Sequence, residues 1–245
     1  MTEQLTNEFI KKRYNSIIET KYHGFYEHFH WLDTYPRWIQ YRTTFDVVWK
    51  ITNGVKFDRM LEVGPGPGTW TKCFLFKHPH ANFTLVDISK EMLQQNRLNL
   101  GERENLSRLV ADFEQFNGHN EEFDLFFSSR CIEYSTDKSK FVKAALAAMK
   151  PGASGFIITK TPRRSMTDRL QHTAQISPSK LKRIIEMHGG SVVRTTPVTV
   201  RARTCSRFPK INLIIWKWVK GKEISSLPSF MRWWMESYII EFRKV

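Results

Sequence analysis

Short apolar runs along the chain alternate with longer segments in which apolar residues recur at helical spacing. Turn-forming or helix-capping residues separate each run from the segment that follows it. Strands that alternate with helices form a parallel sheet covered on both faces, so the pattern indicates an α/β fold. The predicted strands are residues 57–63, 82–86, 107–110, 123–128, 155–160, 191–200 and 236–242, and helices are predicted after the first strand, at 89–100, at 137–149 and from 177 or 179 to 189.

Two segments do not fit this alternation. Residues 5–50 are predicted to be helical and contain more aromatic residues than one core-facing side of a helix can bury. About thirty-five residues with an amphipathic pattern separate the last two strands, and a connection that long is usually functional or structured in itself. We therefore expect one domain over residues 1–245, made of a helical lid (1–56), a central core (57–162) and a C-terminal part (163–245) with a basic amphipathic insertion at 205–235.

The composition is that of a folded globular protein, with 41% hydrophobic and 25% charged residues over 245 positions. Cys73, Cys131 and Cys205 form no C-x-x-C pair, which argues against a disulfide framework and against a zinc site, and no metal is expected. The first residues are polar, and the longest apolar run, 211–216, is too short to span a membrane. These features favour a cytoplasmic location.

The net charge of +14 comes entirely from the C-terminal part. Residues 1–149 carry 19 basic and 19 acidic side chains, whereas residues 150–245 carry 19 basic and 5 acidic ones. Such an excess favours an anionic partner, whether phospholipid, nucleic acid or an acidic substrate. A basic face that only confers solubility is an equally open interpretation.

The first predicted strand runs into a glycine-rich turn, Glu62-Val63-Gly64-Pro65-Gly66-Pro67-Gly68. Glycine permits a tight turn and a close approach of the backbone to a ligand, and the next helix presents free amide groups to an anionic group such as a carboxylate. The spacing differs from the G-x-G-x-x-G of NAD-binding domains, because Thr69 stands where that pattern requires glycine. Asp87 ends the second strand, where a carboxylate can accept hydrogen bonds from both hydroxyls of a ribose.

Five segments between Asp58 and Pro162 resemble, in order, the motifs of class I S-adenosylmethionine-dependent methyltransferases: LEVGPGPGTWT, LVDISKEMLQQNR, VADFEQF, FDLFFSSRCIEYSTD and MKPGASGFIITKTP. DISKEML and the arginine-glutamate-tyrosine segment look most similar to the small-molecule, quinone and lipid-precursor (methyltransferase type 11-like) branch. The resemblance implies a Rossmann-like, seven-stranded, mostly parallel sheet with the last strand antiparallel, in three α/β/α layers. It also implies S-adenosylmethionine as the cofactor of the core, 57–162.

The resemblance assigns several residues to the cofactor. It implies Glu62 near the methionine amino group, Asp87 and Ile88 at the ribose, Met92 under the adenine, and Asp112 with Phe113 at the adenine edge. Met92 and Phe113 can instead be core residues, and Asp112 can be a helix or turn cap. The full set of expected cofactor contacts is Tyr14, Glu62, Gly64, Gly66, Gly68, Asp87, Ile88, Met92, Asp112, Phe113 and Ser129.

The methyl acceptor is expected over the C-terminal ends of the fourth and fifth strands, under the helical lid. A sulfonium methyl group is already activated, so the enzyme mainly has to align the acceptor, exclude water and accept a proton where one leaves. The sequence SSRC stands where DNA- and glutamine-methylating enzymes have Asn/Asp-Pro-Pro-aromatic, which disfavours such substrates. The candidate catalytic residues are Arg130, Glu133, Tyr134 and His172, with Ser129 and Thr161 beside them and His23 and His30 as further candidate bases; for each histidine an ordinary surface or packed imidazole is the favoured alternative.

These features predict an enzyme that methylates a small-molecule or lipid-linked hydrophobic acceptor, with O-methylation favoured over C- and N-methylation. The insertion places tryptophans beside lysines, a mixture typical of peripheral contact with an anionic membrane. A wall of a substrate pocket or an oligomer contact is the close alternative, and nucleic acid is less favoured. The tryptophans are Trp216, Trp218, Trp233 and Trp234.

Two other functions stay open. An RNA methyltransferase would use a cluster of basic residues in the C-terminal part. A regulatory scaffold would bind the cofactor without catalysing transfer. The basic cluster consists of Arg163, Arg164, Arg169, Lys180, Lys182 and Arg183.

Overall fold

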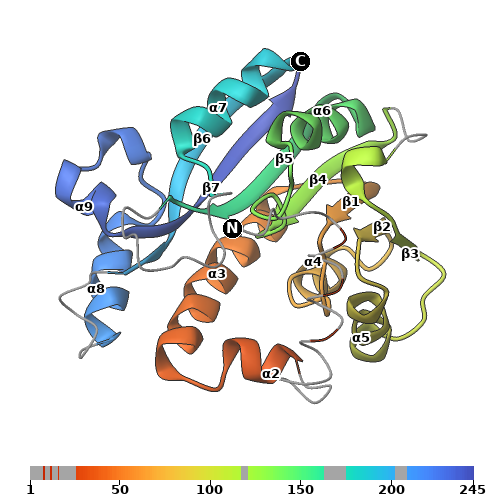
Figure 1. Cartoon of the computed structure of the whole chain (residues 1–245), viewed down its shortest axis with the longest axis horizontal. Helices are drawn as coiled ribbons and strands as arrows, with labels where there is room; N and C mark the ends of the chain where they lie inside the picture. The colour runs from red at the N-terminus through yellow and green to blue at the C-terminus, as the bar shows by residue number, and fades with distance from the viewer. Residues whose placement is uncertain are drawn as a thin grey trace.

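Seven strands form one sheet in the computed structural model of the chain, in the order β3-β2-β1-β4-β5-β7-β6 (Figure 1). The structure describes residues 26–116, 121–162, 175–201 and 209–245, and also Glu8, Lys12 and Ser16. The strands are β1 (Arg59–Val63), β2 (Asn82–Asp87), β3 (Leu106–Val110), β4 (Phe123–Ser129), β5 (Met149–Lys160), β6 (Gly190–Val200) and β7 (Met235–Lys244).

The strand directions confirm the predicted Rossmann-like sheet. Strands β1 to β5 are parallel, and β7 lies between β5 and β6 and is antiparallel to both. Val63 pairs with Val86 on one side and with Ser128 on the other. The segments that follow β1, β2 and β4 therefore meet at one edge of the sheet, the edge at which open α/β sheets bind their ligands.

Helices cover both faces of the sheet (Figure 1). Helix α3 packs against α4 and α8, whereas α6 packs against α7. The side chains of β4 alternate between the two faces: Phe127 lies in one apolar core with Phe74 of α4, and Phe126 lies in the other with Phe141 of α6. The helices are α2 (Tyr26–Trp31), α3 (Tyr35–Gly54), α4 (Thr71–Lys77), α5 (Lys90–Leu100), α6 (Lys138–Ala148), α7 (Pro178–Met187), α8 (Pro209–Val219) and α9 (Ser229–Trp233), with the short 3-10 turns η1 (Phe113–Gln115) and η3 (Ile224–Ser226).

Two boundaries differ from the sequence prediction by more than two residues. The helical segment expected over 5–50 is broken after Trp31, and α3 begins with Pro36 in its first turn, where a missing amide leaves no helical hydrogen bond unmade. Strand β5 begins at Met149 rather than at residue 155, because Met149 already pairs with Phe123 before the register shifts.

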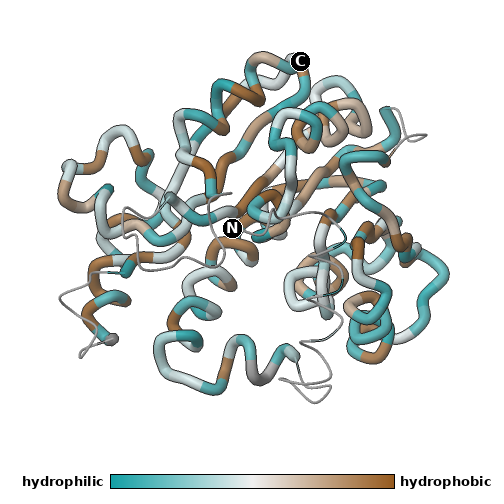
Figure 2. Tube along the Cα trace, viewed as in Figure 1, coloured by the Kyte–Doolittle hydropathy of each residue, from teal (hydrophilic) through white to brown (hydrophobic). Residues whose placement is uncertain are grey.

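The C-terminal insertion is helical where the structure describes it. Helices α8 and α9 and the turn η3 lie between β6 and β7, and Figure 2 shows hydrophobic residues along α8. Trp216 is buried, whereas Trp218 and Trp233 are exposed. Within the described residues, no helix has the length and apolar character needed to cross a bilayer.

Candidate active site

The turn after β1 uses glycine for two different reasons. Gly64, Gly66 and Gly68 have φ angles of 71°, 52° and 88°, a region that residues with a side chain rarely adopt. A Cβ at Gly64 would lie 2.5 Å from Cys131 Cβ, and one at Gly68 would lie 2.8 Å from a side-chain carbon of α5, so both allow close packing. At Gly66 the nearest atom is Met92 Sδ at 4.0 Å. Gly66 therefore leaves open space over the turn.

Asp87, at the end of β2, is hydrogen-bonded to this turn. Its Oδ2 accepts a hydrogen bond from the Gly66 amide (3.1 Å), and its Oδ1 accepts one from the Ser89 amide (2.9 Å). Burial raises the pKa of Asp87 to about 6, against the opposing effect of backbone hydrogen bonds from Ser89, Gly66 and Ile88. Each carboxylate oxygen can accept more than one hydrogen bond, so Asp87 can hold both the turn and a ligand hydroxyl.

A cavity opens over the turn and Asp87. It contains about 870 Å³ of empty space, including the part open to solvent. Ser129 lines it, and its buried hydroxyl oxygen has no hydrogen-bond partner among the described residues. An unpaired buried hydroxyl at this position is suited to a ligand. The predicted residues brought together here are Gly64, Gly66, Asp87, Ile88, Met92, Ser129, Arg130 and Tyr134.

Aromatic side chains wall the cavity on the side of the N-terminal helices. Tyr26, His30 and Trp31 of α2 line it together with Trp70, which directly precedes α4. Tyr26 and His30 stack with ring centroids 4.9 Å apart, and Trp31 meets Trp70 edge-on at 5.6 Å. Among the candidate bases expected in the helical lid, His30 is the one that the structure places at the cavity.

Several residues of the cavity were not candidate site residues in the sequence analysis, and two of them are instructive. Trp70 and Cys131 both line it. Trp70 follows Gly68, the last glycine of the turn, by two positions. This closeness in sequence could have predicted that Trp70 lines the cavity. Cys131 gave no signal, because its place beneath Gly64 depends on how β4 pairs with β1.

Glu62 and Gly68 are not among the residues that line the cavity. Glu62 is 1% exposed and accepts a hydrogen bond from Thr71 Oγ1 (2.8 Å) at the start of α4. Burial raises the pKa of Glu62 to about 8, with a further contribution from the nearby Asp87 carboxylate. Contact of Glu62 with a methionine amino group stays a prediction; in the structure its described hydrogen bond joins β1 to α4.

Asp112 and Phe113 lie beside a smaller hollow that shares Asp87, Ile88, Cys131 and Tyr134 with the cavity. Asp112 Oδ1 accepts a hydrogen bond from the Glu114 amide (3.0 Å), so the residue does cap η1. Phe113 is 6% exposed and packs against Phe141. Asp112 and Phe113 thus serve the local structure and also border the hollow, and their contact with the adenine edge stays a prediction.

Arg130 and Glu133 form an ion pair at the end of β4. Arg130 Nε lies 2.7 Å from Glu133 Oε1, and the same oxygen accepts a hydrogen bond from the Lys160 amide (2.7 Å). Burial disfavours the charge of Arg130, but the Glu133 carboxylate, with smaller contributions from Tyr134 and Glu236, outweighs this effect and the pKa of Arg130 is raised. The prediction that Glu133 faces the acceptor as a base does not fit this arrangement, because its side chain is fully buried and is not among those lining the cavity.

The remaining candidates do not lie at the cavity in the described part of the chain. Thr161 Oγ1 donates a hydrogen bond to the Met235 carbonyl (2.8 Å) and so joins β5 to β7. Tyr14, His23 and His172 lie outside the described residues, as do Arg163, Arg164 and Arg169 of the basic cluster.

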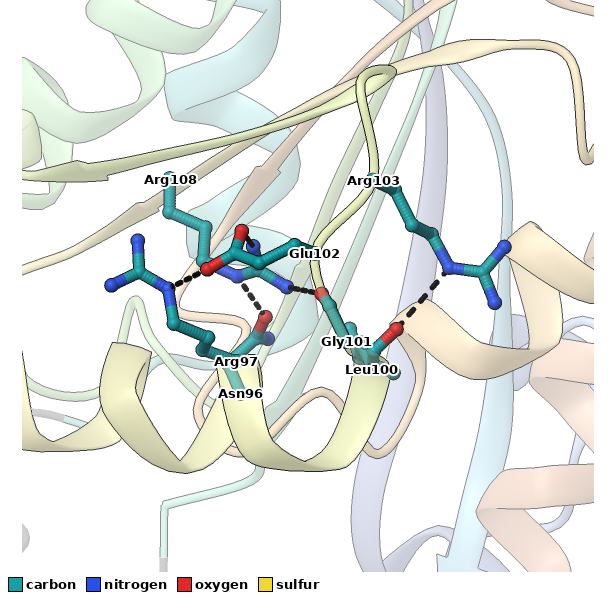
Figure 3. A network of polar contacts seen from close by, with 7 residues as sticks. All are labelled: Asn96, Arg97, Leu100, Gly101, Glu102, Arg103 and Arg108. Carbon is teal, nitrogen blue, oxygen red and sulfur yellow. Dashed lines mark hydrogen bonds and ion pairs between the residues drawn. The ribbon is translucent and has the colours of Figure 1, made fainter.

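A polar network joins α5, β3 and the loop between them (Figure 3). Arg108 of β3 donates a hydrogen bond from Nε to Asn96 Oδ1 (2.8 Å) and one from its guanidinium to the Gly101 carbonyl (2.8 Å). Asn96 in turn donates to the Gly66 carbonyl (3.4 Å). The network therefore ties α5 and β3 to Gly66, the same turn residue whose amide binds Asp87.

Comparison with known proteins agrees with this geometry. The model of the family described as "Methyltransferase domain" matches residues 60–152. Malonyl-[acyl-carrier protein] O-methyltransferase 2 of Ilyobacter polytropus is 30% identical over 102 residues, which cover 42% of this chain and 38% of that protein. The chain therefore matches well under half the length of this curated relative.

Solved structures share the fold over most of the chain. The Haloferax volcanii putative methyltransferase solved with the Trm112 methyltransferase activator gives a TM-score of 0.66 at 15% identity, covering 94% of this chain and 96% of that one. The N-methyltransferase NodS of Bradyrhizobium japonicum in complex with S-adenosyl-L-homocysteine gives 0.57 at 13% identity, covering 87% and 89%. Residues 60–152 thus match a methyltransferase domain, within a fold that the chain shares with solved methyltransferases.

Proposed function

We propose that this protein is an S-adenosylmethionine-dependent methyltransferase that transfers the methyl group to an oxygen atom of a small-molecule or lipid-linked hydrophobic acceptor. The observation that carries the proposal is the cavity in which the open turn at Gly66 and the carboxylate of Asp87 face an aromatic wall and Arg130. The matches to proteins named malonyl-[acyl-carrier protein] O-methyltransferase support oxygen as the acceptor atom.

The residues present fit the cofactor. The Gly64–Gly66 backbone can approach its carboxylate end, Asp87 has lone pairs for the ribose hydroxyls, and the unpaired Ser129 hydroxyl can complete the polar contacts. Ile88 and Met92 offer apolar contact for the adenine. When bound, S-adenosylmethionine supplies a methyl group that is activated by its positively charged sulfur.

On the acceptor side, the residues of the cavity position the acceptor, exclude water and supply a positive charge. The aromatic wall of Tyr26, His30, Trp31 and Trp70 excludes water and favours an apolar acceptor body. Arg130 is the one Lys or Arg among the described lining residues, and its guanidinium can hold an anionic acceptor oxygen in place. An ionised acceptor needs no base, whereas for a hydroxyl acceptor His30 or Tyr134 is placed to take the proton.

We infer that Glu133 is a positioning residue for Arg130. The buried carboxylate is anchored to β5 through the Lys160 amide and the Thr159 hydroxyl (3.2 Å), and it holds the guanidinium by the ion pair. A fixed cation can align an acceptor better than a mobile one, because less conformational entropy is lost on binding.

We also propose that a lipid-linked acceptor is reached at an anionic membrane surface through the helical insertion. Ile214 and Trp218 of α8 and Phe230 and Trp233 of α9 are exposed apolar residues. Exposed lysines flank them, and residues 205–235 carry 6 basic and 1 acidic side chains. Tryptophan with lysine at a surface suits the boundary between lipid and water.

A methyl-transfer screen tests the proposed activity. The protein is incubated with methyl-labelled S-adenosylmethionine and, separately, with extracted lipids, quinones, acylated carrier proteins and RNA. We expect label in a lipid or small-molecule fraction as a base-labile methyl ester or a stable methyl ether. Label found only in RNA, with a steep dependence on salt, would replace this proposal with the RNA methyltransferase.

An Arg130→Met variant separates acceptor binding from cofactor binding. It should keep its affinity for S-adenosylhomocysteine and lose most methyl transfer. Equal loss of both would mean that Arg130 supports the fold or the cofactor rather than the acceptor.

A further inference from the structure

A second hollow lies away from the cofactor cavity and is lined by residues of α3, the end of α8 and strands β5, β6 and β7. It contains about 1150 Å³ of empty space, including the part open to solvent, and shares no lining residue with the cofactor cavity. Phe156 and Ile239 form its floor at mid-strand positions of β5 and β7. The hollow is therefore on the face of the sheet rather than at the edge where the cofactor site lies.

Two lysines at this hollow, Lys50 and Lys220, have no carboxylate partner in the part of the chain that the structure describes. The other charged residues there are already paired, Arg194 with Glu241, and Asp46 with Arg42 of its own helix (3.4 Å). Among the described residues, neither Lys50 nor Lys220 forms an ion pair.

The two lysines come from opposite walls. Lys50 is on α3 and Lys220 directly follows α8, and Lys50 Nζ lies 4.0 Å from the position that a Cβ on Gly221 would take. Both therefore line the hollow as unneutralised cations.

Trp216 places an unsatisfied polar group at the same hollow. Its side chain lines the hollow and is only 3% exposed, yet its Nε1 is buried with no hydrogen-bond partner in the described part of the chain. Lys220 Nζ lies 5.1 Å from the centre of the Trp216 ring. A buried N–H group without an acceptor is costly, and a ligand with an acceptor atom would satisfy it.

We propose that this hollow binds an amphipathic anion, a carboxylate or phosphate on an apolar body, as a second and non-reacting ligand. The anionic head lies between Lys50 and Lys220 and accepts a hydrogen bond from Trp216 Nε1. The apolar body packs on Phe156 and Ile239. Apolar walls with a few convergent polar groups are the usual features of a small-molecule site.

Calorimetric titration of the full chain tests the site with three defined probes below their aggregation concentrations: decanoate, decyl phosphate and the neutral decanol. We expect saturable binding of one equivalent of an anionic probe, with the better of the two identifying the head group, and much weaker binding of decanol. Lys50→Glu or Lys220→Glu should weaken binding of the anionic probe by roughly tenfold or more, because a charge-assisted contact becomes a repulsion.

Matched variants make the test decisive. Trp216→Phe keeps an aromatic ring but removes the N–H group, and should weaken binding several-fold. Lys217→Glu changes an exposed lysine of α8 that does not line the hollow, and should leave affinity unchanged. S-adenosylhomocysteine affinity should be the same in all four variants, which shows that each is folded. The proposal is overturned if neither anion saturates one site, or if Lys217→Glu weakens binding as much as the lining variants do.

Discussion

The amide of Gly66 donates a hydrogen bond of 3.1 Å to Asp87 Oδ2, so the residue expected to bind the ribose also fixes the turn expected to hold the other end of the cofactor. The two parts of the site are therefore coupled. A change at Asp87 is expected to affect both a direct contact with the cofactor and the shape of the loop.

Asp87→Ala should abolish measurable binding of S-adenosylhomocysteine in calorimetry, because charge-assisted hydrogen bonds of about 1.5–3 kcal/mol each are lost at two places. Asp87→Asn keeps the shape but removes the charge, and should bind more weakly than the native chain and more tightly than the alanine variant. Native affinity in Asp87→Ala would refute the cofactor assignment.

The raised pKa of Asp87 predicts a pH dependence of cofactor affinity. Its ordinary pKa is 3.8 and its value in the folded chain is about 6, so the carboxyl group is protonated in the folded chain over most of that interval. Because the ionised form is the better acceptor for ribose hydroxyls, affinity should fall as the pH is lowered through 6. Titration of S-adenosylhomocysteine between pH 5 and pH 8 measures this, and Asp87→Asn should show a flatter profile over the same interval.

Gly66→Ala tests whether open space at the turn serves the ligand. Gly66 and Gly152 both have positive φ angles, of 52° and 78°, and beyond their chain neighbours no described residue has an atom closer than 4.0 Å to a built Cβ at either position. Alanine at either position should lower stability by about 1–2 kcal/mol in denaturant unfolding. Only Gly66→Ala should also weaken S-adenosylhomocysteine binding. An equal effect of both variants on the ligand would mean that affinity follows global stability.

We predict that ionisation of Glu62 destabilises the folded chain. Its pKa is raised from 4.5 to about 8, so between these values the folded chain holds a proton that the unfolded chain has released. The free energy of unfolding therefore falls as the pH rises through this interval, by up to a few kcal/mol from this group. Glu62→Gln keeps an acceptor for the Thr71 hydroxyl without the charge. Its stability relative to the native chain should increase from pH 5 to pH 8, and a constant difference would contradict the buried ionisation.

The positions of Asp87 and Glu62 show what the sequence can and cannot predict. Asp87 was placed correctly because a strand end, the Ser89 cap and the glycine turn are all local patterns, and the Ser89 side chain does accept the Met92 amide. Glu62 is nearer to the glycines in sequence but does not line the cavity, because its orientation is set by Thr71 on another element. Likewise, the sequence could not tell buried Trp216 from exposed Trp218, since burial there depends on how α8 packs against α3.

Glu133→Gln distinguishes a positioning residue from a base. If Glu133 only holds Arg130, the variant should lower kcat/KM for the acceptor, mainly through KM, and the pH–rate profile should keep its shape. Glu133→Asp should recover part of the loss, because a carboxylate is retained. Disappearance of the acidic limb of the pH–rate profile in Glu133→Gln would instead identify Glu133 as the proton acceptor.

Exchange of the exposed tryptophans tests the membrane surface. Trp218 and Trp233 are 67% and 62% exposed, and each should bury part of its ring at the lipid boundary. The double variant Trp218→Ala, Trp233→Ala should reduce co-sedimentation with vesicles of phosphatidylcholine and phosphatidylglycerol by at least about tenfold, since burying one aromatic side chain contributes roughly 1.5–3 kcal/mol. Phe76→Ala removes an equally exposed ring, 73% accessible, from α4, and should leave vesicle binding unchanged. The membrane proposal is contradicted if the double variant binds vesicles as well as the native chain does, or if Phe76→Ala loses binding to the same extent. In either case α8 and α9 are not the contact surface, and an oligomer contact becomes the explanation for their exposed side chains.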